Sequence, residues 1–455
     1  MTSKVTKKVS DDGFGEYVNG SPLNVPLDSG IKNPAKFTKA VKTDSAFGKS
    51  RTRLEQIHQL DQLKVTYGPE SDEDMENYLI FEQDLKFFRY FGNILGVDME
   101  FYWKPGFLFC VSLLLLFVIV SQLTYTQYVH IKNHNYYRIL ETLACYGITI
   151  SMVLKIVTFL KSFHAIRALL NSTIKVCKAN DSGCRAAKIR DRLLYNSRFY
   201  MWTTIVVMAS ITIFLAYPTK AFLVDHELVS LLPIEYIFVD SSTLSGFITA
   251  NLISSLLGAF ANVGTVYAIL MIVSLILNYS VFVDMFEEDV KYLDEMWSRE
   301  SNTTVTYRHS FLRNMCRKQQ DINAYVVEIK RLLDDYIFHY FIASYLGQII
   351  CLFQIVVSDW KSGYAIAYGM FLEMMFYCLM GTKISSENER IMTALQQSNW
   401  YLYDQHTQNV FLTLWVASTN ANEMWIGPLA PLSVLTGTDV VKSIYSYYNI
   451  MLEVV

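Results

Sequence analysis

The chain has 455 residues, of which 52% are hydrophobic and only 18% are charged. A soluble chain carries about 25% charged residues, so this composition favours a membrane protein over a soluble one. The net charge of −3 excludes the strongly basic balance that nucleic-acid partners select. We therefore expect a lipid membrane around the chain and no nucleic acid partner.

The first hundred residues are polar and contain no apolar stretch of the secretory-signal kind. Residues 1–70 are rich in Lys, Ser, Gly and Pro, which predicts a cytosolic, largely disordered segment. Residues 71–104 predict a pre-membrane amphipathic helix, with Ser71 as N-cap before an acidic first turn. Its excess of acidic residues favours packing on the bundle over binding the inner leaflet. The apolar side chains at helical spacing are Leu79, Phe81, Leu85, Phe88 and Phe91.

Seven long apolar stretches follow, and a helix needs about 20 apolar residues to cross a bilayer. The fourth stretch is uncharged for 43 residues, so it is either two spans or one helix that projects beyond the membrane. The seven predicted spans are Gly106–Leu123, Leu140–Leu160, Phe199–Pro218, Ser241–Val283, Tyr336–Ser358, Ser362–Gly381 and Leu435–Val455.

The distribution of Lys and Arg among the connections decides between these two alternatives. The segment before Pro105 carries 14, the connection from Lys161 to Arg198 carries 9, and that from Lys291 to Arg331 carries 8. The connections that alternate with them carry 2, 1 and 1. The positive-inside rule places the basic connections in the cytosol, so Ser241–Val283 must cross once, as one long helix.

The resulting fold class is all-α: a seven-transmembrane helical membrane protein with a cytosolic N-terminus and an external C-terminus, the inverse of a G-protein-coupled receptor. Apolar residues continue at helical spacing beyond the spans, which predicts helices extended into a cytosolic packing domain. Residues 105–383 then hold spans one to six with these extensions, and residues 384–455 hold a cytosolic helix and the last span. The extension residues are Ile322, Val326, Ile329, Leu332, Leu333, Ile391, Ala394 and Leu395.

Two further features follow from this topology. The sequons at Asn171, Asn278 and Asn302 fall on the cytosolic side, so we expect no glycan on them. None of the seven cysteines falls in an external connection, which argues against extracellular disulfides.

Motifs of catalysis are absent from the sequence: it contains no GxSxG, HExxH or P-loop. His130 and His134 are four residues apart but lack a third ligand, and a surface pair is the better interpretation. We therefore expect neither an enzyme nor a metal or cofactor site. Lys155 and Glu373 lie within spans at matching depths, and because charges in lipid tend to pair, we expect them to pair or to line a polar crevice.

The end of the chain resembles the C-terminal helix of insect odorant receptors, in which a Pro-Leu-Ser/Thr start leads to a Ser-Tyr-Ser-Tyr-Phe-like stretch. The matching residues are Pro431, Leu432, Ser433, Ser443, Tyr445, Ser446, Tyr447 and Tyr448. Phe87–Trp103 and Trp400–Tyr403 also look like that family, and the inverted seven-span order extends the resemblance from about Ser71 to Val455. Gly437–Asp439 departs from it, because the family is usually apolar there.

The resemblance implies a subunit of an odorant-gated, non-selective cation channel in the plasma membrane of a sensory neuron dendrite. Such receptors form tetramers with co-receptor subunits, and the last helix of each subunit lines the pore. Here Ile450 and Val454 are the expected constriction, since an apolar ring closes a pore by dewetting. Glu453 beside them would favour cations.

The family's odorant pocket lies in the outer half of the bundle, among spans two, three, four and six. Aromatic and Met side chains there predict a dry, adaptable cavity for a small volatile odorant. A gustatory-type receptor and a secondary transporter remain alternatives; the latter should show internal repeats and broken helices. The candidate ligand-binding residues are Tyr146, Ile150, Met208, Ile211, Thr212, Leu215, Phe260, Tyr364, Tyr368 and Phe371.

Overall fold

The computed structural model describes residues 72–97, 107–178, 184–220, 243–298, 304–358, 362–419 and 423–454, with isolated residues between 230 and 239 and at 360. The side chains of residues 210–219 lie outside this description. The chain divides into two units, Met1–Gly68 and Pro69–Val455, and every described residue belongs to the second. The predicted disordered segment, Ser71 and Trp103 therefore fall outside the described residues.

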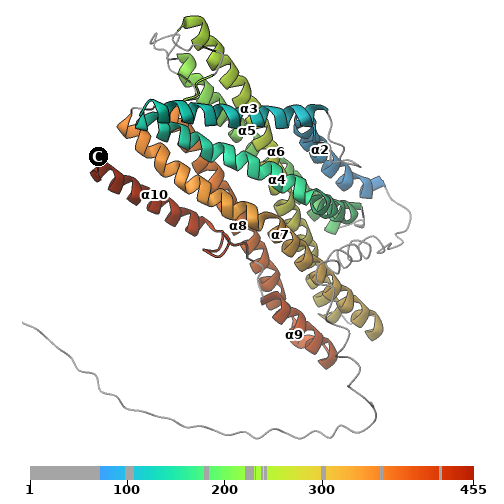
Figure 1. Cartoon of the computed structure of the whole chain (residues 1–455). Coiled ribbons are helices and arrows are strands. Elements are labelled where there is room, and N and C mark those ends of the chain that lie inside the picture. Colours follow the sequence, from blue (N-terminus) through green and yellow to red (C-terminus); the bar gives the residue numbers. More distant parts are fainter. Residues whose placement is uncertain are drawn as a thin grey trace, which may run out of the picture. The chain divides into compact units, whose positions relative to one another are not determined.

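The described part of the second unit is all-α, as predicted, and contains no named strand (Figure 1). Only an isolated bridge between Trp425 and Pro431 has extended pairing there. The helices are α2 (Asp72–Leu95), α3 (Phe107–Lys132), α4 (Tyr136–Lys178), α5 (Cys184–Lys220), α6 (Leu244–Ser298), α7 (Val305–Val357), α8 (Ser362–Gln396), the 3-10 turn η2 (Trp400–Leu402), α9 (Gln405–Thr419) and α10 (Val434–Val454).

Five of these helices are long and apolar enough to cross a membrane: α3, α4, α6, α7 and α8. The chain is therefore a multi-pass membrane protein. Helices α5 and α10 cover the third and seventh predicted spans. The count of seven and the orientation of the termini stay predictions.

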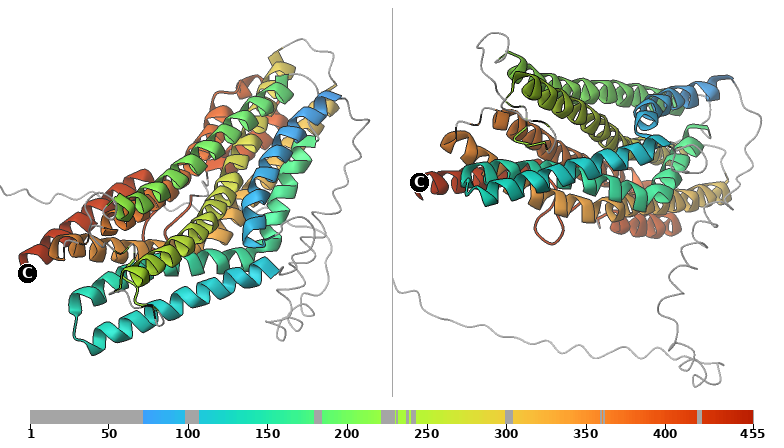
Figure 2. Two further views of the ribbon diagram at one scale, coloured as in Figure 1. Left: turned by 90° about the horizontal axis from the view of Figure 1, so that it is seen from above. Right: turned by 45° about the horizontal axis from the view of Figure 1, so that its top comes forward.

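Helix α6 is the central element of the fold. It runs without a break for 55 residues, which confirms that the long apolar stretch forms one helix. At 1.5 Å per residue its length is about 82 Å, more than twice the hydrocarbon thickness. Residues 266–283 are buried almost throughout, because α2, α4, α5, α7 and α8 all contact this helix (Figure 2).

Helix α2 lies within the segment that was predicted to form an amphipathic helix, and it packs on α4, α5 and α6. One residue of the predicted apolar face, Leu79, is exposed. Phe81, Phe88 and Phe91 are buried, and the ring of Phe88 lies edge-on to Tyr200 of α5 with centroids 4.9 Å apart. Gly96 ends the helix with a φ of +73°, a conformation that residues with a Cβ rarely adopt. A Cβ at Gly96 would lie 2.2 Å from the backbone N of Phe109, so the end of α2 is held close against α3.

The helices continue beyond their apolar stretches and pack there, as the repeating apolar residues predict. Helix α7 spans 53 residues, and its Ile322, Val326 and Ile329 are buried. Ile391 and Leu395 of α8 are buried in the same core. Helix α9 packs against α7 and α8 at this end of the bundle. The sequence did not predict α9 as a helix separate from its neighbours.

Candidate functional site

The outer end of the bundle, in the predicted orientation, contains its own apolar cluster. Cys145, Cys351, Trp360 and Met370 are among its buried members, and Tyr146 packs against them. The hydroxyl of Tyr146 donates a hydrogen bond of 3.0 Å to Thr124 Oγ1. This cluster occupies much of the region in which the odorant pocket is predicted.

The described members of the predicted ligand-binding set differ in their exposure. Tyr146, Met208 and Phe371 are half-buried, whereas Ile150, Tyr364 and Tyr368 are exposed on the single chain. Phe260 faces a cavity at the α2 end of the bundle. The ligand-binding set therefore stays a prediction; the side chains of its members Ile211, Thr212 and Leu215 lie outside the described part of the chain.

Lys155 and Glu373 form the predicted ion pair within the bundle. The Nζ atom of Lys155 on α4 lies 2.6 Å from Oε1 of Glu373 on α8, and the two side chains are only 6% and 15% exposed. Lys155 also donates to Thr265 Oγ1 of α6 at 3.5 Å. An isolated charge inside a membrane protein is costly, so this contact holds three spanning helices together.

A cluster of three tyrosines surrounds the carboxylate end of this pair. The hydroxyl of Tyr377 donates to Glu373 Oε1 at 3.0 Å, and Tyr336 shares a hydrogen bond of 2.7 Å with Tyr377. Tyr340 packs edge-on against Tyr377, with ring centroids 5.1 Å apart. The cluster therefore links α7 to α8 directly beside the ion pair. Sequence spacing did not predict this cluster, because Tyr377 lies 41 residues from Tyr336.

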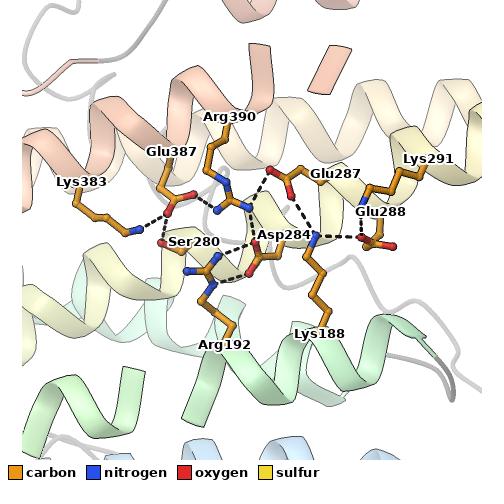
Figure 3. Close-up of polar contacts among 10 residues, drawn as sticks. All are labelled: Lys188, Arg192, Ser280, Asp284, Glu287, Glu288, Lys291, Lys383, Glu387 and Arg390. Carbon is orange, nitrogen blue, oxygen red and sulfur yellow. Dashed lines mark hydrogen bonds and ion pairs between the residues drawn. The ribbon is translucent and has the colours of Figure 1, made fainter. Parts of the chain in front are cut away.

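A second charge network joins α5, α6 and α8 beyond the apolar stretches (Figure 3). The carboxylate of Asp284 accepts hydrogen bonds from Nε and Nη2 of Arg192, at 2.5 and 2.9 Å. It also accepts one from Nη2 of Arg390 at 2.7 Å. Arg390 reaches Glu387 Oε2 at 2.5 Å and Glu287 Oε1 at 2.8 Å. Asp284 is buried, so its charge depends on these two guanidinium groups.

The network continues through Glu387, which is fully buried. Its Oε1 accepts from Lys383 at 2.6 Å and from Ser280 of α6 at 2.8 Å. Nearby, Lys188 of α5 pairs with Glu287 and Glu288, each at 3.0 Å. These ion pairs were not predicted from the sequence. The available signal was that Asp284, Glu287 and Glu288 share one helix face directly after the long apolar stretch.

Helix α10 packs closely on α8. A Cβ at Gly381 of α8 would lie 2.1 Å from the backbone O of Leu432, and a Cβ at Gly437 would lie 2.7 Å from Cys378 Sγ. Gly437, where the sequence departs from the odorant-receptor pattern, is therefore needed for this contact. Tyr345 of α7 also shares a hydrogen bond of 2.8 Å with Ser443.

The opposite face of α10 is uncovered in the single chain. Leu435, Tyr445 and Ile450 are exposed there, Ile450 to 55%. Glu453 is exposed as well, and the side chain of Val454 lies outside the described part. The predicted gate residue Ile450 thus points away from the bundle to which it belongs, toward whatever lies beside this chain.

The chain is thus an all-α, multi-pass membrane protein. Its bundle contains a buried ion pair, and one face of its last helix, α10, is uncovered in the single chain. The family model described as 7tm odorant receptor matches residues 135–445, and the chain belongs to this family. It is thus an odorant receptor, and its family is not one of enzymes.

Two solved structures share the fold. The insect olfactory receptor OR5 from Machilis hrabei in complex with eugenol superposes with a TM-score of 0.65 at 13% identity, covering 84% of this chain and 100% of that chain. A second structure of OR5 from Machilis hrabei gives a TM-score of 0.63 with the same identity and coverage. No curated protein matches the sequence.

Proposed function

We propose that this odorant receptor is the ligand-binding subunit of an odorant-gated, non-selective cation channel assembled with co-receptor subunits. The uncovered face of α10 is the observation that carries the proposal. Leu435, Tyr445 and Ile450 form an apolar and aromatic strip on a helix whose other face packs tightly on α7 and α8. Exposed apolar strips of this kind mark interaction surfaces, and neighbouring subunits around a pore would cover this one.

In the assembled channel, Ile450 and Val454 form the constriction. One apolar ring per subunit expels water from a narrow pore and blocks ions until the helices move apart. Glu453, exposed next to this ring, attracts cations to the pore mouth. The channel acts in the plasma membrane of a sensory neuron dendrite.

The odorant is a small, neutral, volatile organic molecule that binds in the outer half of the bundle. Tyr146 and Phe371 are half-buried there and supply aromatic surface with a hydroxyl group. The relative from Machilis hrabei was solved with eugenol, which is a molecule of this kind. The match to the odorant receptor family counts against the gustatory-type and transporter alternatives.

The test is to record currents from cells that express this chain with and without a co-receptor while a panel of volatiles is applied. We expect odorant-evoked cation current only when both subunits are present. Strong ligand-gated current from this chain alone would refute the requirement for a partner. Substrate flux without conductance would favour a transporter instead.

A single substitution tests the pore assignment within the same cells. Ile450→Ser makes the constriction polar, so we expect current without odorant, because a wetted pore conducts. Val416→Ser is the matched control, since Val416 is an exposed aliphatic residue on α9 rather than α10. Equal basal currents from the two variants would place the gate elsewhere.

A further inference from the structure

A cavity of about 100 Å³ lies between α3, α4 and α6, next to the last turn of α2. One water needs roughly 10–15 Å³ by this measure, so the cavity has room for a small organic molecule. Its walls are almost entirely apolar, with Phe109, Ile156, Phe159 and Phe260 among them. Phe260 is the one residue that it shares with the predicted odorant set.

The wall of this cavity includes residues that also lie on the outer surface of the bundle. Leu113 of α3 and Leu160 of α4 line the cavity and are also exposed on the outside of the bundle. Both helices are long and apolar enough to span a bilayer, so lipid chains surround them at this level. A molecule dissolved in the bilayer can therefore enter between α3 and α4 without passing through water.

Lys155 supplies the one charged group of the cavity wall that the structure describes. A lysine ammonium has three N–H donors. Glu373 takes one at 2.6 Å and Thr265 Oγ1 takes a second at 3.5 Å. Among the described residues the third has no acceptor, so it is available to a molecule in the cavity.

The Lys155–Glu373 ion pair also favours a neutral molecule in the cavity over a charged one. A carboxylate would compete with Glu373 for Lys155, and a cation would compete with Lys155 for Glu373. Either exchange would leave a buried charge without its partner, which is costly. A neutral ligand with an oxygen that accepts one hydrogen bond leaves the pair intact and satisfies the third N–H.

We propose that this cavity is a second ligand site, which takes a neutral apolar molecule with one acceptor oxygen, such as a ketone, ester or ether, from the surrounding bilayer. A ligand held by Lys155 acts on α8 through Glu373. Gly381 of α8 contacts Leu432 directly before α10, and Cys378 of α8 contacts Gly437 within α10. Occupancy of the cavity therefore biases the position of α10.

The glycines of α6 provide a matched pair of variants. Gly264 lines the cavity, and a Cβ there would meet only Leu95 Cδ2, at 3.9 Å, so Gly264→Leu fills the space without a backbone clash. Gly258 lies on the same helix outside the cavity wall, and a Cβ there would meet nothing within 4 Å. Gly258→Leu therefore adds the same side chain to the same helix and leaves the cavity open.

The experiment is photolabelling of the full chain in phosphatidylcholine nanodiscs with a diazirine derivative of 2-undecanone, with labelled residues mapped by mass spectrometry. We expect label on cavity residues such as Met152 and Ile156. Gly264→Leu should lower this label about tenfold, which corresponds to about 1.4 kcal/mol of binding, and Gly258→Leu should leave it unchanged. If Gly264→Leu does not purify, Ala261→Leu fills the same cavity from the preceding turn.

Competition tests the contact with Lys155. Unlabelled 2-undecanone should displace the probe about fivefold better than undecane, because one hydrogen bond contributes on the order of 1 kcal/mol. Equal competition by the two compounds would refute the contact. Label confined to the lipid-facing side of α3, as at Phe117, or label unaffected by Gly264→Leu, would refute the site. The measurement needs neither current nor co-receptor, so it stands apart from the proposed channel function.

Discussion

The Nη2 atom of Arg390 on α8 lies 2.7 Å from Oδ1 of Asp284 on α6, and the same carboxylate accepts two hydrogen bonds from Arg192 on α5. One buried acidic group therefore ties together three helices that are distant in sequence. Two cations on one anion would repel each other, but Glu387 and Glu287 balance Arg390.

Removing the shared carboxylate charge should destabilise the protein strongly. Asp284→Asn leaves Arg192 and part of Arg390 without a partner, and breaking a buried ion pair costs about 3–5 kcal/mol. The melting temperature in detergent should fall by several degrees. Glu389→Gln removes a charge from an exposed position on α8 and should change it little. Similar melting temperatures for the two variants would show that the network is not structural.

The Lys155–Glu373 pair should behave as a unit. Lys155→Met and Glu373→Gln each leave one buried charge alone, so each should reduce surface expression. The double variant Lys155→Met/Glu373→Gln should recover much of it, because it buries no charge. Lys161→Met is the control, since Lys161 pairs with Asp335 across α4 and α7 at 3.9 Å with both side chains exposed. A double variant worse than either single variant would argue against the pairing.

Asp84 should make the docking of α2 sensitive to pH. Burial raises the pKa of its carboxyl from 3.8 to about 7, against a hydrogen bond from Ser197 that lowers it. The folded state therefore favours the protonated acid. The corresponding stability is fully present below pH 4 and is lost as the pH rises through about 7. The whole effect is at most about 4 kcal/mol, from roughly three pKa units.

The measurement is hydrogen exchange of α2 between pH 5 and pH 8, corrected for intrinsic rates. Asp84→Asn should remove the loss of protection that ionisation of Asp84 causes at high pH, so α2 should be more stable in this variant at pH 8. Glu82→Gln changes a neighbouring acid that pairs with the largely exposed Lys86, and it should keep the native dependence. Identical pH profiles for native protein and Asp84→Asn would contradict the role of Asp84.

The contact between α8 and α10 should tolerate no side chain at Gly381. A Cβ there would lie 2.1 Å from the backbone O of Leu432, so Gly381→Ala must displace the start of α10. We expect odorant-evoked current to be abolished or reduced severalfold at unchanged total expression. Gly369→Ala on the same helix meets nothing within 4 Å and serves as the control. Normal current from Gly381→Ala would show that α10 does not need this close approach.

Local sequence patterns were sufficient to predict most of the helices, but not α9 and not all of the contacts between helices. Apolar length and loop charge predicted α6 as one helix, because both are properties of a single stretch of chain. The Lys155–Glu373 pair was also within reach, since two rare intramembrane charges have few possible partners. The contacts of Asp284 with Arg192 and Arg390 could not be predicted, because the basic connections hold many candidate cations for one acid.

The candidate ligand-binding residues also show that local sequence patterns do not predict contacts between helices. Tyr364 and Tyr368 lie four residues apart on α8, but both are exposed on the single chain. Which face of a helix meets a cavity depends on how neighbouring helices are rotated, and periodicity within one helix carries no such information. Gly264 and Leu95 both line the cavity beside α2, although they lie in distant segments of the chain.

The unbroken length of α6 constrains how this gene can change. A helix turns by 100° per residue, so one codon inserted between Thr265 and Asp284 would rotate everything after it by that angle. Asp284 would leave Arg192 and Arg390, while Thr265 would stay beside Lys155. No loop lies between Thr265 and Asp284 that could accommodate the inserted residue. Substitutions can accumulate along this segment, but we expect related sequences to keep its number of residues constant.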